Sequence, residues 1–280
     1  TIAPSPTMRL AGNKSSGKAE CFKVDYRSLG QRRVYAWYCR PKRTGRSPGI
    51  VINPWYGLGQ VEAPLYIAEM GYAVLAYQGR GYEVDLSSYP PDNSSYMTLG
   101  ITDPKGYVYR EMVAHALRSL DFLASRPEVD QARSGMIGPS QGGGLTLIAA
   151  ALDPRVKAAA ADFPFLTGIP EALPVATYPY QEVRDYLAKD PGQQAVVAAT
   201  LAYFDTANFA ARITVPVFIT AGLKDNVCPA EGIRAAYEKI PAKDKELQVF
   251  PLSGHSDDNA LRWWNAFAFL NKHLHPEIQN

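Results

Sequence analysis

The chain has 280 residues, of which 46% are hydrophobic and 20% are charged, and its formal net charge at pH 7 is +2. This length and apolar content are enough for one α/β unit with a sizeable core, so we expect a single domain over residues 1–280. Acidic and basic residues are interspersed, which gives no electrostatic case for nucleic-acid binding. No apolar run approaches the roughly 18 residues of a membrane span, and no charged-then-apolar signal segment opens the chain.

Two alternating segments near the beginning of the chain predict a β-hairpin. Residues 22–26 and 33–39 alternate like strands and are joined by a turn near residue 30. Such a hairpin puts Cys21 and Cys39 opposite one another, near the separation that a cross-strand disulfide bridges. Two interpretations stay open. A disulfide would favour an exported protein, whereas two buried reduced cysteines would suit a cytoplasmic one.

The rest of the chain alternates between strand-like apolar runs and helical patterns. This alternation predicts an α/β fold with a mainly parallel central sheet, helices on both faces and catalytic loops at the carboxyl ends of the strands. Segment 163–212 departs from the pattern and is interpreted as a helical insertion near the active site that shapes substrate choice. In chain order we expect a strand at 50–53, a helix at about 60–70, a strand at 72–77, a long loop at 79–104, a helix at about 106–126, a strand at 134–138, a helix from 141 to about 153, strands at 156–162 and 216–221, a helix at 230–239, a strand at 246–251 and a helix at 257–274.

The most informative segment is Gly138–Gly142, which reads Gly-Pro-Ser-Gln-Gly between a predicted strand and a predicted helix. This pentapeptide is typical of a nucleophile elbow, because glycines leave room for the chain to double back and expose the serine hydroxyl. Ser140 is therefore the candidate nucleophile. The alternative is that Ser140 is an ordinary helix N-cap in a glycine-rich turn.

Two further side chains follow predicted strands in the order that this chemistry needs. Asp225 comes just after one strand, and His255 lies in the loop after the next. The order Ser, Asp, His is that of the α/β-hydrolases. His255 would accept the proton of Ser140, and Asp225 would fix the tautomer of the imidazole and stabilise the imidazolium. As alternatives, Asp225 only forms a turn, or Asp257 or Asp258 is the acid, although both follow His255.

Backbone N–H groups are expected to stabilise the tetrahedral intermediate. One belongs to Gln141, the residue after the nucleophile. The second belongs to the Gly-rich turn after strand 50–53, where we favour Tyr56 over Trp55. The rings of Trp55, Tyr56 and Tyr96 could also bind a sugar ring or an aryl ester, or they could simply pack.

The sequence predicts no cofactor and no metal. The four histidines are scattered, without a His-x-x-x-His motif or paired Cys spacing. The expected partner is a small-molecule ester.

With these residues identified, the chain resembles the acetyl xylan esterase and cephalosporin C deacetylase family, family seven of the carbohydrate esterases, over nearly its whole length. The resemblance implies an α/β-hydrolase that deacetylates small sugars and xylo-oligosaccharides, with oxyanion donors at Tyr56 and Gln141. It also implies a ring-shaped hexamer whose active sites face an inner chamber. The likeness is strongest in Ile137–Leu145, Lys157–Phe165, Leu201–Asn208 and Gly222–Pro229.

The chain departs from the family pattern at a few positions. Gln78 and Arg80 exchange the outer residues of the family's Arg-Gly-Gln, Ser256 stands where a glutamate usually follows the histidine, and Pro54-Trp55 replaces His-Gly. We expect these residues to position loops and to contribute to substrate binding. They leave the triad intact, so the predicted function is a serine carboxylic ester hydrolase for acetylated sugars. The alternatives are an esterase for feruloyl, methyl-ester or lactone groups, a serine peptidase, and a catalytically silent binding protein.

Overall fold

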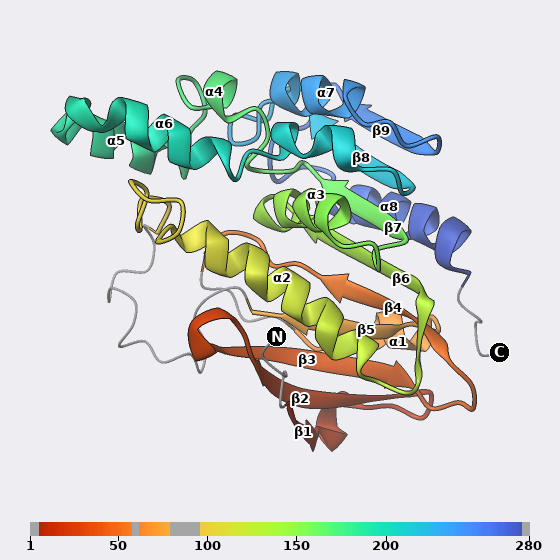
Figure 1. Ribbon diagram of the computed structural model, residues 1–280. Helices are drawn as coiled ribbons and strands as arrows, with labels where there is room; N and C mark the ends of the chain where they lie inside the picture. Colours follow the sequence, from red (N-terminus) through yellow and green to blue (C-terminus); the bar gives the residue numbers. More distant parts are fainter. Residues whose placement is uncertain (1–5, 58–61, 79–95, 276–280) are drawn as a thin grey trace.

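A computed structural model of the protein describes residues 6–57, 62–78 and 96–275. Within these ranges, nine strands form one sheet in the order β1-β2-β3-β5-β4-β6-β7-β8-β9 (Figure 1). The strands are β1 (Thr7–Leu10), β2 (Ala19–Arg27), β3 (Arg33–Pro41), β4 (Ser47–Ile52), β5 (Ala73–Tyr77), β6 (Val129–Pro139), β7 (Ala158–Asp162), β8 (Val217–Gly222) and β9 (Lys245–Phe250).

The six strands from β4 to β9 pair in parallel, and β1 to β3 join one side of this sheet as antiparallel strands. Strands β5, β7 and β8 are buried along their whole length, as expected of parallel strands that are covered on both faces. These strands therefore show no alternation between buried and exposed positions. The predicted α/β fold with a mainly parallel sheet is confirmed.

Helices pack on both faces of the sheet and create two separate cores. Successive strand residues point to opposite faces, so Val51 packs with α2 and α3 whereas Ile50 packs with α1 and α8. None of the described helices is long and apolar enough to cross a membrane. The helices are α1 (Leu65–Glu69), α2 (Val108–Ala124), α3 (Gln141–Leu152), α4 (Ile169–Ala172), α5 (Tyr180–Lys189), α6 (Gln194–Ala202), α7 (Ala230–Glu238) and α8 (Asn259–Leu274).

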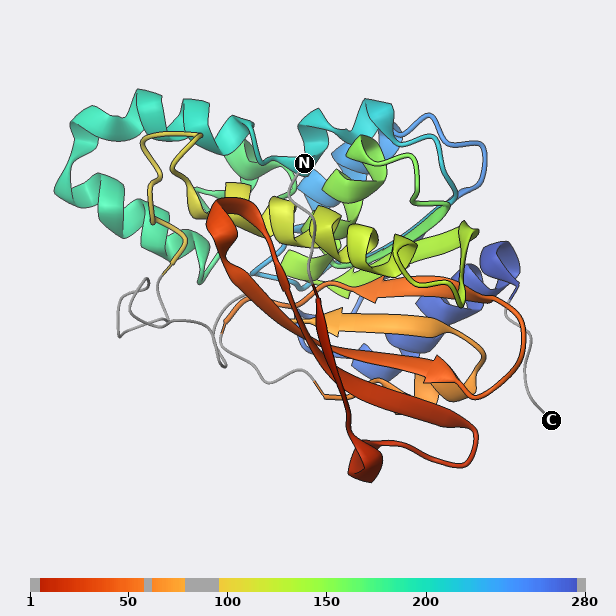
Figure 2. The same ribbon diagram turned by 60° about the horizontal axis from the view of Figure 1, so that its bottom comes forward.

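The predicted hairpin is strands β2 and β3, which lie toward one edge of the sheet (Figure 2). Cys21 and Cys39 are direct partners in its register and form a disulfide bond. Of the two interpretations of these cysteines, the structure therefore contains the disulfide and not the pair of reduced thiols. Strand β1 was not expected, because its four residues are mostly exposed and carry no buried alternation.

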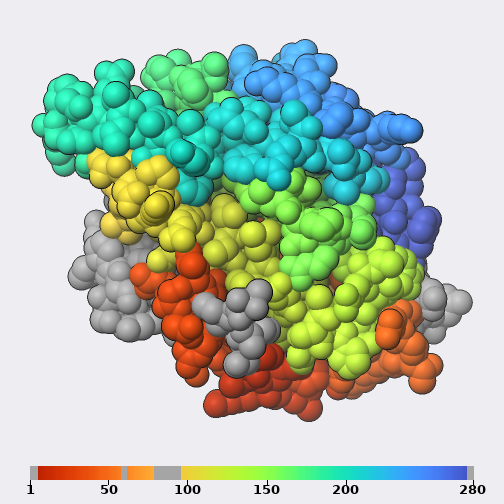
Figure 3. All heavy atoms as spheres, viewed as in Figure 1, coloured from red at the N-terminus to blue at the C-terminus, as the bar shows by residue number. Residues whose placement is uncertain are grey.

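The segment between β7 and β8 forms the predicted helical insertion. It contains α4, α5, α6 and short 3-10 turns. Helices α5 and α6 project past the sheet on the side to which the arrowheads of β4 and β5 point (Figure 2), and their atoms form the upper left part of the surface in Figure 3. Thus the insertion lies at the carboxyl ends of the parallel strands.

Several expected boundaries shift. Strand β6 begins five residues earlier than predicted, at Val129, since it continues its pairing with Ser47 and Pro48 of β4 across an irregularity. Helix α1 starts only at Leu65, and the expected long loop at 79–104 falls mostly outside the described residues.

Candidate active site

Ser140 occupies a sharp turn between β6 and α3. Its φ and ψ are 52° and −119°, a strained conformation for a residue with a side chain. The glycines on either side make the turn possible: a Cβ added to Gly138 would lie 2.6 Å from the carbonyl carbon of Gly142, and one added to Gly142 would lie 2.3 Å from the carbonyl oxygen of Asn53. The Ser140 N–H donates to the carbonyl oxygen of Asp162 at 2.8 Å, which fixes the turn to the end of β7.

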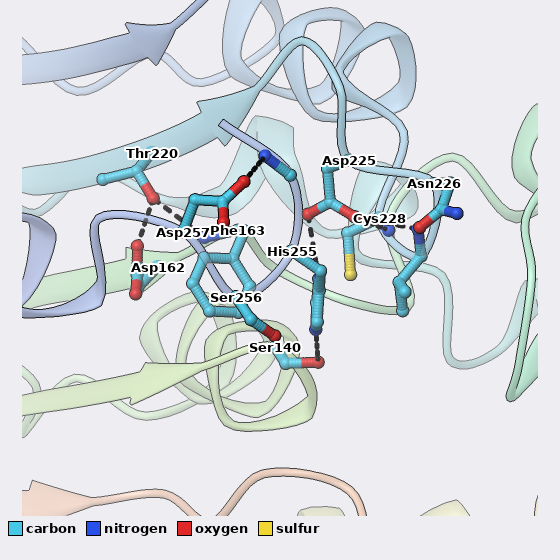
Figure 4. Close-up of polar contacts among 12 residues, drawn as sticks. Ser140, Asp162, Phe163, Thr220, Asp225, Asn226, Cys228, His255, Ser256 and Asp257 are labelled. Carbon is cyan, nitrogen blue, oxygen red and sulfur yellow. Dashed lines mark hydrogen bonds and ion pairs between the residues drawn. The ribbon is translucent and has the colours of Figure 1, made fainter. Parts of the chain in front are cut away.

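The side chains of Ser140, His255 and Asp225 form one chain of hydrogen bonds (Figure 4). Nε2 of His255 lies 3.2 Å from Oγ of Ser140, and Nδ1 lies 2.9 Å from Oδ2 of Asp225. The serine hydroxyl makes no N-cap bond, so the interpretation of Ser140 as an ordinary cap is wrong. The structure brings the three predicted residues together from three different strand ends.

Asp225 forms a turn and contacts the histidine at the same time. Its Oδ1 accepts the N–H groups of Val227 and Cys228, both at 2.8 Å, which leaves Oδ2 for the histidine. The rival acids have other partners: Asp257 accepts the N–H of Gly254, and Asp258 accepts the hydroxyl of Ser253. Both therefore stabilise the histidine loop, and neither contacts the imidazole.

The two predicted oxyanion donors lie at element ends. Gln141 is the first residue of α3, where an N–H has no intrahelical acceptor, and Tyr56 lies in the turn after β4. Within the described ranges, no acceptor is assigned to either N–H. The side-chain Nε2 of Gln141 donates to the carbonyl oxygen of Trp55 at 3.2 Å, so α3 and the turn that carries Tyr56 are directly connected.

A half-buried carboxylate from the insertion, Glu182, holds the same turn. Glu182 of α5 accepts the Tyr56 hydroxyl at 2.7 Å and the N–H of Met97 at 2.9 Å. Burial, followed by the hydrogen bond to Glu182, raises the pKa of Tyr56, so its hydroxyl stays protonated and donates. Neither Glu182 nor this contact was predicted, because the sequence gives no signal that links α5 to residue 56.

Tyr96 does not offer a face to substrate. It is 1% exposed, and its ring stacks on Tyr56 with centroids 4.0 Å apart. Its hydroxyl donates to Oε1 of Gln141 at 2.9 Å and accepts the N–H of Gly57. The prediction that Tyr96 contacts substrate is therefore wrong. Its ring packs on Tyr56 and its hydroxyl bonds to Gln141 and Gly57, so Tyr96 supports the turn that carries Tyr56.

An open pocket of about 810 Å³ contains the serine and the histidine. Trp55 and Ser256, which were predicted to lie near the site, line this pocket. Gln78 does not line it, and Arg80 lies outside the described residues. Most of the lining is apolar or aromatic, with Ile52, Pro54, Tyr56, Ala63, Pro64, Tyr66, Ala76, Tyr77, Pro139, Phe163, Tyr178, Pro179, Val227, Ala260 and Trp263 among its members.

A sequence model of the acetyl xylan esterase family matches residues 5–273. The chain belongs to this family. Among solved structures, the acetyl xylan esterase from Paenibacillus sp. R4 is 31% identical, with a TM-score of 0.88 over 97% of this chain and 89% of that one. Acetyl xylan esterase 1 from Thermoanaerobacterium sp. JW/SL YS485 is 28% identical, with a TM-score of 0.85 over 96% of this chain and 88% of that one.

A curated relative is longer than this chain. The acetyl esterase Axe7A of Xylanibacter ruminicola is 28% identical over an alignment of 251 residues, which covers 84% of this chain and 55% of that protein. The chain thus spans about half the length of this relative. The match to the acetyl xylan esterase family spans all nine strands as well as Ser140, Asp225 and His255.

One cluster in this acetyl xylan esterase family member has donor atoms that a metal could use. Asp225, Cys228 and His255 each offer one within 4.8 Å of the others. The hydrogen bonds of the triad already account for the carboxylate and the imidazole. Burial raises the pKa of the Cys228 thiol, which keeps it in the neutral form that neither binds a metal strongly nor acts as a nucleophile. We assign no metal to this cluster.

Proposed function

We propose that this protein is a serine esterase that removes acetyl groups from acetylated sugars or xylo-oligosaccharides through an acyl-enzyme on Ser140. The observation that carries the proposal is the alignment of Ser140, His255 and Asp225 at 3.2 and 2.9 Å in a chain of the acetyl xylan esterase family. A serine hydroxyl is a weak nucleophile at neutral pH, so a neutral imidazole within hydrogen-bond reach is the group that activates it.

The reaction proceeds in two halves. Oγ of Ser140 attacks the acetyl carbon while Nε2 of His255 takes the hydroxyl proton, and Asp225 stabilises the resulting imidazolium. The tetrahedral intermediate collapses, the C–O bond to the sugar breaks, and His255 returns the proton to the leaving alcohol. Water then attacks the acetyl-enzyme with His255 again as base, which releases acetate and restores the serine.

The N–H groups of Tyr56 and Gln141 are the proposed oxyanion donors. Donors act best when they are fixed before the charge develops, because no reorganisation is then needed during the reaction. Two contacts support this preorganisation: the Gln141 side chain is bonded to the carbonyl of Trp55, and Glu182 is bonded to the Tyr56 hydroxyl.

A second candidate is an esterase for larger acyl groups, such as feruloyl esters. The size of the pocket, about 810 Å³, is the observation that favours it, since an acetyl group fills only a small part of such a volume. Initial rates on 4-nitrophenyl esters from acetate to octanoate, beside acetylated xylo-oligosaccharides, separate the two. We expect the acetate ester to be fastest and the sugar acetates to be cleaved. A rate maximum on long or aromatic acyl groups would favour the second candidate.

A further inference from the structure

The pocket continues well beyond the triad. The same cavity that contains Ser140 and His255 also contacts α1 through Tyr66 and α8 through Trp263. These two helices pack in the same core on one face of the sheet. After an acetyl group is accommodated, most of the cavity is left for another part of the substrate.

The chemistry of the reaction decides which part that is. The leaving alcohol takes its proton from His255, so the alcohol must lie on the histidine side of the scissile bond. The pocket residues Ser256, Asn259 and Trp263 come one, four and eight positions after His255 in the sequence. Asn259 and Trp263 are four residues apart on α8, so they share one helix face and lie about 6 Å apart along its axis. This wall of the pocket therefore faces the alcohol.

Tyr66 and Trp263 hold one another in place at this wall. Nε1 of Trp263 donates to the Tyr66 hydroxyl at 2.9 Å, and the indole also packs edge-on against Phe267 with centroids 5.2 Å apart. Tyr66 is nevertheless 45% exposed. Since its oxygen accepts from Trp263 and no described residue accepts its hydroxyl hydrogen, that hydrogen is left to donate to a ligand.

We propose that Tyr66 and Trp263 form a leaving-group subsite that binds a sugar ring of the alcohol part of the substrate. This proposal rests on the proposed deacetylase function. A pyranose has apolar C–H faces and a rim of hydroxyl groups, so it needs aromatic surface with polar groups at its border. The border here is supplied by the Tyr66 hydroxyl, the exposed carboxylate of Glu62 and Asn259.

The test compares two acetate esters that differ only in the alcohol. Ethyl acetate has an alcohol too small to reach the subsite, whereas acetylated xylobiose reaches it. A 4-nitrophenyl ester is unsuitable, because its aromatic leaving group would itself bind there. For Trp263→Ala and Tyr66→Ala we expect kcat/KM on acetylated xylobiose to fall about tenfold or more, with kcat/KM on ethyl acetate within about twofold of wild type. Trp263→Phe keeps an aromatic face and should retain most of the sugar activity.

Leu261→Ala is the matched control. Leu261 lies on the same helix, α8, is 53% exposed and does not line the pocket. We expect it to change neither rate by more than about twofold. If Trp263→Ala lowers both rates equally, or lowers neither, or if Leu261→Ala has the same selective effect, the subsite proposal is wrong. If the wild type releases no acetate from any sugar acetate but cleaves ethyl acetate, the proposed function fails together with the sugar-binding role.

Discussion

Arg262 and Asp162 form a buried ion pair next to His255, the candidate base. Nε of Arg262 lies 3.0 Å from Oδ1 of Asp162, and the arginine side chain is 1% exposed. Nη2 of Arg262 donates to the carbonyl oxygen of His255 at 3.2 Å, while the guanidinium lies 4.3 Å from the ring of Phe163. That ring packs edge-on against the imidazole, with centroids 4.5 Å apart (Figure 4). The backbone carbonyl of Asp162 accepts the Ser140 N–H, so the ion pair connects the segments that carry Ser140 and His255.

Breaking this pair should destabilise the protein and lower its activity. Arg262→Met leaves Asp162 as a buried charge without its cation, which costs about 3–5 kcal/mol in the free energy of unfolding. The histidine loop also loses a hydrogen bond, so kcat should fall. Denaturant unfolding and kcat of Arg262→Met, Asp162→Asn and the double variant give the coupling energy. We expect the double variant to be more stable than the sum of the single effects predicts.

The control for that experiment is Lys272→Met on the same helix. Lys272 pairs with Asp244 at 3.1 Å, but its side chain is 65% exposed, so we expect a change below about 1 kcal/mol. Equal losses for Arg262→Met and Lys272→Met would contradict the account of the buried pair.

The pH dependence of stability should carry the signature of Asp162. Burial is the largest influence on this carboxyl and raises its pKa from 3.8 to about 6, although Thr220 and Arg262 act in the opposite direction. The folded state therefore holds the proton more tightly than the unfolded state does. The resulting stabilisation is complete below pH 3.8 and is lost as the pH rises through about 6, a change of about 3 kcal/mol. Unfolding free energies of wild type and Asp162→Asn between pH 4 and 7 test this, and parallel profiles would refute it.

Asp225→Asn should disable the histidine without disturbing the turn. The two N–H groups of Val227 and Cys228 need an acceptor, so the asparagine oxygen stays with them and its NH2 group faces Nδ1 of His255. The imidazole then carries its proton on Nε2 and cannot accept one from Ser140. We expect kcat to fall by about 10³ to 10⁴-fold with the fold intact, measured by steady-state kinetics and circular dichroism. Asp257→Asn, in the histidine loop, should lose far less; an equal loss would reject Asp225 as the catalytic acid.

Glu182→Gln tests whether the insertion supports the oxyanion hole. The substitution places an NH2 group against either the Tyr56 hydroxyl or the Met97 N–H, both of which donate to the carboxylate. Loss of one charge-assisted hydrogen bond costs about 1.5–3 kcal/mol. With about half of that loss expressed in the transition state, kcat falls by about 4- to 13-fold. Asp185→Asn, on the exposed side of the same helix, is the control and should leave kcat unchanged. Equal kcat values for Glu182→Gln and Asp185→Asn would show that Glu182 does not support the oxyanion hole.

The sequence was sufficient for the residues whose role depends on local pattern. A Gly-x-Ser-x-Gly turn and carboxylate and imidazole groups just after strands predict Ser140, Asp225 and His255, because parallel strands deliver their ends to one edge. The wrong assignment of Tyr96 shows where such reasoning stops. Whether an aromatic ring faces a ligand or a neighbouring ring depends on contacts between distant segments.

The buried pair was missed for the same reason, although one signal existed. Arg262, Ala266 and Phe269 share a face of α8, and that face is otherwise apolar. A charged residue on an apolar helix face indicates a buried partner of opposite charge. The sequence does not show which residue that partner is, because Asp162 lies 100 positions away from Arg262. The predicted hexamer depends on surfaces between copies of the chain and stays a prediction.

The proposed mechanism requires that Ser140 carries the acetyl group as a covalent ester during each turnover. The most direct measurement is mass spectrometry of protein quenched with acid during turnover of an acetate ester, for wild type and Ser140→Ala. We predict a mass increase of one acetyl group that maps to the peptide containing Ser140, and an alanine variant with neither the adduct nor acetate release. Acetate release by Ser140→Ala, or an acetyl group on another residue, would contradict the account.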